Sequence, residues 1–123
     1  MVAVPVEFEQ VARLARRLPD IAEGTWYGSP AFRVGGKVFA RRHENDADLV
    51  LIKVGGLERD ALVATWPDRF LLTDHRPERD DSVLMRLSAT TLADLAEVGE
   101  LLDAAWRRTA PPHLAGRLED KEP

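Results

Sequence analysis

The spacing of apolar side chains along the chain predicts one helix near each end. After Pro5, apolar residues recur at the i, i+3, i+4 and i+7 spacing of a buried helical stripe, which predicts a helix from Pro5 to Arg17. A longer helix is predicted over residues 92–108, with the prolines at 111–112 after its end. The inner stripe of this helix is expected to comprise Leu92, Leu95, Gly99, Leu102 and Trp106. A short helix is expected over residues 57–66.

Short apolar or alternating runs between these helices are typical of strands. Residues 48–54 are so uniformly apolar that they predict a central strand. Further strands are expected within residues 20–25, 31–34, 37–42, 69–73 and 83–87. This order predicts an α+β fold with two layers, an antiparallel β-sheet with the N- and C-terminal helices packed on one face. Residues 1–112 are the expected single domain, and residues 113–123 a short charged C-terminal tail.

The stretch TWYGSPAFRVGGKVFARR, residues 25–42, predicts a β-hairpin. Gly35 and Gly36 suit the positive φ angles of a two-residue primed turn. The expected pairs are Val34 with Lys37, Arg33 with Val38, Phe32 with Phe39, and Ala31 with Ala40. Because side chains alternate along a strand, one face is expected to contact the core and carries Phe32, Val34, Lys37, Phe39 and Arg41. The other face is expected to meet solvent or a partner and carries Ala31, Arg33, Val38, Ala40 and Arg42.

Composition narrows the classes of function. The chain has 123 residues and no cysteine, which excludes disulfides, thiolate catalysis and thiolate metal sites. It has no apolar run long enough to cross a membrane and no signal-peptide pattern, so a cytoplasmic protein is expected, with a monomer as the default. The net charge of −4 argues against indiscriminate polyanion binding.

The charges are unevenly distributed along the chain. Residues 31–42 contain no acid and four cations, Arg33, Lys37, Arg41 and Arg42. Such a patch can bind DNA or another phosphate-bearing ligand, or its arginines can simply cover the sheet. Residues 94–103 contain four acids and no base, a candidate surface for a protein partner. A groove beside the hairpin is expected to be lined by Trp26, Tyr27, His75 and Arg86.

No motif in the sequence predicts catalysis, a metal or a cofactor. His43, His75 and His113 lie far apart, without the spacing of a metal site. Asp74 precedes His75, but adjacent residues on an extended backbone point in opposite directions, which favours a local hydrogen bond over an acid–imidazole pair. A non-enzymatic protein is therefore predicted.

The residues WYGSPAFRVGGKVFA, from Trp26 to Ala40, resemble the signature of the MmcQ/YjbR family of small bacterial domains. The resemblance continues through Thr-Asp-His at 73–75, Leu-Met-Arg-Leu at 84–87 and Asp-Ala-Ala-Trp-Arg at 103–107. It implies a CyaY-like α+β fold, also described as a double-wing DNA-binding arrangement, and the label of a DNA-binding protein. The positions that match the family pattern are Gly28, Pro30, Phe32, Gly36, Lys37, Phe39, His75 and Trp106.

Frataxin relatives of that fold bind iron through an acidic ridge on the first helix. Here Glu7 and Glu9 are too few, and three arginines follow them, so no metal site is expected. Two non-enzymatic functions stay open at this point, beside an enzyme that uses His75, for which the sequence offers no nucleophile or cofactor motif. The first is weak, salt-sensitive nucleic-acid binding through the basic hairpin. The second is a small-ligand or protein-interaction module that uses the groove beside it.

Overall fold

The fold is a six-stranded antiparallel sheet with helices on one face. The structure, a computed structural model, describes residues 3–73 and 81–116. The sheet has the order β1-β2-β3-β4-β6-β5. Its strands are β1 (Ala22–Trp26), β2 (Ser29–Val34), β3 (Lys37–Arg42), β4 (Leu49–Ile52), β5 (Phe70–Leu71) and β6 (Val83–Arg86). The predicted α+β class and the antiparallel sheet are confirmed.

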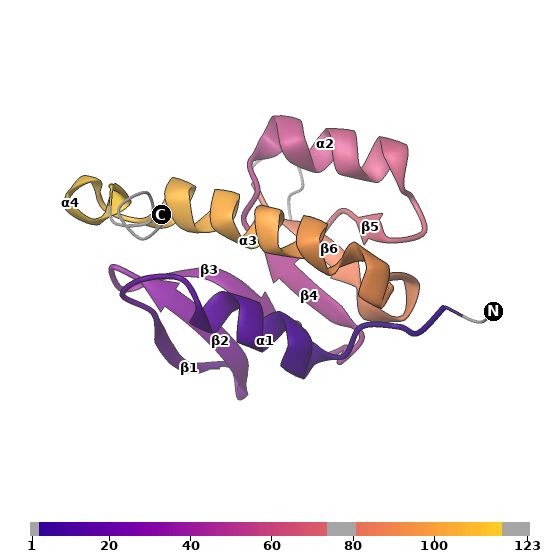
Figure 1. The fold of residues 1–123 in the computed structure, drawn as a ribbon, viewed down its shortest axis with the longest axis horizontal. Helices are drawn as coiled ribbons and strands as arrows, with labels where there is room; N and C mark the ends of the chain where they lie inside the picture. The colour runs from indigo at the N-terminus through magenta and orange to yellow at the C-terminus, as the bar shows by residue number, and fades with distance from the viewer. Residues whose placement is uncertain (1–2, 74–80, 117–123) are drawn as a thin grey trace.

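Within the residues that the structure describes, three main helices and three shorter ones accompany the sheet. The main ones are α1 (Phe8–Arg16), α2 (Gly56–Thr65) and α3 (Leu95–Thr109). The shorter ones are η1 (Leu87–Ala89), η2 (Leu92–Asp94) and α4 (Pro112–Ala115). Figure 1 shows α1 and α3 lying across the same face of the sheet, with α3 also in contact with β3 and β4. Across the described residues, every helix is too short or too polar to span a bilayer.

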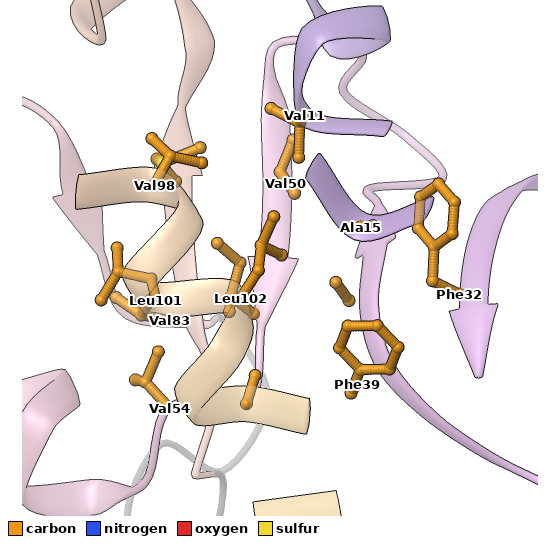
Figure 2. Packing of buried hydrophobic residues seen from close by; sticks show 14 of the residues in the cluster. Val11, Ala15, Phe32, Phe39, Val50, Val54, Val83, Val98, Leu101 and Leu102 are labelled. Atoms are coloured by element: carbon orange, nitrogen blue, oxygen red, sulfur yellow. The ribbon is translucent and has the colours of Figure 1, made fainter. Parts of the chain in front are cut away.

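The main core lies between this helical layer and the sheet. Figure 2 shows side chains from α1, α3 and the strands meeting there, among them Val11, Leu102, Phe39 and Val50. Strand β4 is buried on both faces, as its uniformly apolar sequence predicts, because it lies inside the sheet between β3 and β6. A second, smaller apolar cluster lies on the face away from the helices and comprises Leu49, Leu51 and Leu84, with Leu71 packed against them.

Two helix boundaries differ from the prediction. Helix α1 begins at Phe8 instead of Pro5, because Pro5 forms an isolated β-bridge with Thr91. A capping box between Glu7 and Gln10 then starts the helix. The second is the start of α4, a helix that was not predicted: it contains His113, the first residue of the expected tail, and Leu114 packs against the core.

The buried stripe of α3 is rotated from the predicted one. Its buried residues are Val98, Leu101, Leu102, Ala105 and Trp106, whereas Leu92 is exposed. Leu92 belongs to the separate turn η2, which Thr91 and Asp94 cap, so the α-helical period begins only at Leu95. Gly99, also predicted in the stripe, faces α1, because a Cβ there would meet the Leu14 side chain at an ordinary 3.8 Å.

Candidate functional site

Two tight turns, one at each end of β2, join the three strands β1, β2 and β3 that carry most of the candidate residues. Gly35 and Gly36 have φ angles of 59° and 81° and join β2 to β3, which confirms the predicted primed turn. A second turn of the same kind joins β1 to β2, where Tyr27 and Gly28 have φ angles of 50° and 82°. This second hairpin was not predicted, and Tyr27 was expected only to line a groove beside the first.

The register of β2 and β3 departs from the prediction within the strands. Val34 pairs with Lys37 and Arg33 with Val38 as expected, but Phe32 then pairs with Ala40, and Ala31 with Arg41. A β-bulge opposite Phe32 and Arg33 causes this shift, because it adds one residue to β3. Phe39 and Ala40 consequently both lie in the main core.

The bulge exchanges the faces of the last two arginines in β3. Arg41 pairs with Ala31 and Leu51, whose row continues into the Leu84 of the smaller apolar cluster, so it lies on the open face of the sheet. Arg42 pairs with Val50, which lies in the main core, and its guanidinium carbon is 5.4 Å from the centroid of the Phe8 ring in α1. The prediction that Arg33 and Arg42 share a face is therefore wrong, and Arg41 takes the place of Arg42.

A hollow of about 360 Å³ lies beside the β2–β3 turn on the open face. We call it the basic hollow, and it is lined by Trp26, Arg33, Gly36, Lys37, Val38, Arg41, Leu51, Lys53 and Ser82. Four of these side chains are cationic. Lys37, predicted to face the core, is exposed instead, because the end of the strand lets its long side chain reach the rim.

One cation of the basic hollow is neutralised within the described residues. Arg41 forms an ion pair with Glu44, and its guanidinium carbon lies 5.8 Å from the centroid of the Trp26 ring. A backbone hydrogen bond and then the hydrogen bond from Arg41 lower the pKa of Glu44 below its usual value, so the carboxylate stays charged at neutral pH. This pair anchors Arg41 to the loop after β3.

The other three cations keep their charge available. Arg33 donates from Nη2 to the Thr25 carbonyl at 3.0 Å, and a Cβ on Gly24 would lie 3.1 Å from its Nη1. Its guanidinium thus lies across β1 close to Gly24, where a larger residue would displace it by a few tenths of an ångström. Among the ion pairs of residues 3–73 and 81–116, none involves Arg33, Lys37 or Lys53. The basic hollow therefore carries a net positive charge.

The remaining candidates divide into three groups. Trp26 lines the basic hollow, and Tyr27 contacts the Trp26 ring from the turn. Arg86 lies on the open face opposite Leu49 but outside the basic hollow, where its Nε donates to the Asp68 carbonyl at 3.3 Å. His75 lies outside the described residues. Lys53 was missed, although a lysine at the end of an apolar strand is a signal that water reaches that position.

The acidic segment 94–103 is partly engaged within the fold. Arg69 is buried, stacks on the Trp66 and Phe70 rings, and lies 3.8 Å from Asp94 and 3.5 Å from Glu97. This contact leaves less acidic surface for a protein partner than the sequence indicated. Among the described residues, no group of three or more histidines and carboxylates is placed to hold a metal ion.

Comparisons with known proteins agree on the fold. The YjbR family model matches residues 16–108, well over half of the chain. Among solved structures, the chain is similar to the Deinococcus radiodurans protein DR2400, described with a DUF419 domain, at a TM-score of 0.70 and 17% identity. The alignment covers 94% of this chain and 86% of that one. No match is found among curated proteins.

Proposed function

The chain belongs to the YjbR family, and we propose that it is a non-enzymatic domain that binds nucleic acid weakly through the phosphates. The contacts come from the basic hollow, with Arg33, Lys37 and Lys53 as the phosphate ligands. Arg41 has a different role. Glu44 neutralises its charge, and its guanidinium packs over the Trp26 ring. Arg42 is left out of the interface because it lies against α1.

The observation that carries this proposal is the convergence of three available cations on one concave surface. The chain as a whole is acidic, so a cluster of cations with a single internal carboxylate partner needs an explanation other than net charge. Side chains of lysine and arginine at this density bind phosphate oxygens and release counterions. Such contacts position a nucleic acid and read little sequence.

We expect the affinity for a short labelled DNA strand to fall steeply with salt. Three phosphate contacts give a slope of log K against log salt of roughly −2 for a single strand. The variant Arg33→Ala/Lys37→Ala/Lys53→Ala should bind roughly 100-fold more weakly at low salt, with a slope near zero. Fluorescence anisotropy at a series of NaCl concentrations measures both quantities.

A matched control separates the basic hollow from net charge. The variant Arg13→Ala/Arg17→Ala/Arg42→Ala removes the same charge from α1, the residue after it and the helical face of β3. It should keep the slope and most of the affinity. Equal losses in the two triple variants, or no binding by the wild type at the lowest salt, would contradict the proposal.

A second candidate is a small phosphate-bearing ligand, which the concavity of the basic hollow favours. A volume of about 360 Å³ lies in the range of small-molecule sites. A ligand held there stabilises the folded state by mass action. If this candidate is correct, one mononucleotide or sugar phosphate should raise the Tm of the wild type while an abasic DNA strand leaves it unchanged. If the abasic DNA strand raises the Tm and none of the small phosphate ligands does, the result supports nucleic-acid binding instead.

A further inference from the structure

The turn between β1 and β2 presents two aromatic rings to solvent at the edge of the basic hollow. Tyr27 is 83% exposed and Trp26 is 41% exposed. Their ring centroids lie 5.4 Å apart with the planes at 87°. We call this pair the aromatic tip. Neither ring belongs to the apolar clusters that hold the fold together.

Tyr27 occupies a backbone position that is unfavourable for its type. Its φ of 50° is left-handed, a conformation that glycine and asparagine adopt readily and a tyrosine adopts at a cost. The first central position of such a turn normally carries asparagine, aspartate or glycine. A strained position that holds a large exposed ring points to a role in binding rather than in folding.

We infer that the nucleic acid bound by the basic hollow is single-stranded, with an unpaired base stacked on the aromatic tip. This inference rests on the proposed function. A nucleotide carries its base and its phosphate side by side, so a site for one strand needs rings and cations next to each other. Trp26 supplies that adjacency, because it lines the basic hollow together with Arg33 and Lys37.

A duplex fits this arrangement poorly. Its bases are stacked on one another, so an exposed side chain reaches only their edges in the grooves. A single strand offers free ring faces to which aromatic side chains add stacking energy whatever the sequence. The aromatic tip therefore contributes to binding only when the bases are unpaired.

The test compares four labelled 10-mers at one low salt concentration. They are a DNA strand, the RNA strand of the same sequence, a DNA strand of abasic sites and a DNA duplex. The wild type should bind the DNA or the RNA strand at least about 5-fold more tightly than the abasic strand. The tighter of the two identifies the preferred sugar. The duplex should bind no better than the abasic strand.

The variant Tyr27→Asn makes the test independent of folding. Asparagine suits the left-handed turn, so this variant should be at least as stable as the wild type. Its affinity for base-bearing strands should fall about 5-fold or more, whereas its affinity for the abasic strand should not change. Two results overturn the inference while leaving phosphate binding intact. The first is equal wild-type affinity for the base-bearing and abasic strands. The second is a duplex that binds as tightly as, or more tightly than, the base-bearing strands. Absence of binding to all four overturns the proposed function as well.

Discussion

Replacement of Trp106 by alanine is expected to lower the free energy of unfolding by about 3–5 kcal/mol. The side chain is fully buried in the main core and is the largest residue there. Its Nε1 also donates to the Pro19 carbonyl at 2.9 Å, which ties α3 to the segment after α1. The alanine variant leaves a cavity and a carbonyl without its donor. Urea denaturation should give a lower midpoint with an unchanged slope.

The variant Trp106→Phe separates the two contributions. Phenylalanine keeps most of the ring packing but cannot donate to Pro19, so the loss should be about 1–3 kcal/mol. A small domain has a free energy of unfolding of only about 5–15 kcal/mol, so the alanine variant is expected to unfold well below the wild-type temperature. A loss under 1 kcal/mol for Trp106→Ala would mean that the packing between α3 and α1 is not as the structure has it.

The general form of the fold could be predicted because its signals are local. The glycine pair at 35–36 specifies a primed turn, and the uniformly apolar run in β4 specifies a strand covered on both faces. Helix α3 shows its period over fifteen residues, enough to predict the element although not its first residue. The start of α1 was predicted wrongly at Pro5. A proline suits the first turn of a helix, but it also fits an extended segment such as the one that forms the bridge with Thr91.

The register of β3 could not be predicted, and it decides the composition of the site. Phe39 and Ala40 are both apolar, so the sequence fits a regular strand as well as one with a bulge. Only the packing of both side chains into the main core selects the bulge. A slip of one residue reverses every side chain beyond it, which is why Arg41 reached the open face and Arg42 did not.

The site is consequently a product of topology more than of motif. Lys53 directly follows β4 and Ser82 directly precedes β6, both outside the hairpin, and the pairing of β3 with β4 and of β4 with β6 brings them beside it. The open face also explains why these cations are tolerated. The helices cover the other face, so a charge here keeps its contact with water instead of being buried in the core.

Replacement of Gly35 by alanine is expected to cost about 2–4 kcal/mol, although the residue lies in a surface turn. Its φ of 59° is left-handed, and a Cβ there would lie 2.5 Å from Cδ and 2.9 Å from Cγ of Pro111. The alanine would have to push away the segment between α3 and α4 or open the turn. Gly36 is the matched control, because its φ is 81° but a Cβ would meet nothing within 4 Å. Gly36→Ala should cost only about 1–2 kcal/mol in urea denaturation.

A double-mutant cycle with Pro111→Ala tests the contact itself. The alanine at 111 lacks the two ring carbons that a Cβ at position 35 would strike. In that background the cost of Gly35→Ala should fall to the value for Gly36→Ala, with a coupling energy of about 1–2 kcal/mol. Gly36 and Lys37 line the basic hollow, so the turn at its rim lies close to Pro111, just after α3. An additive cycle would contradict the prediction, because the cost of Gly35→Ala would then not come from a clash with the Pro111 ring.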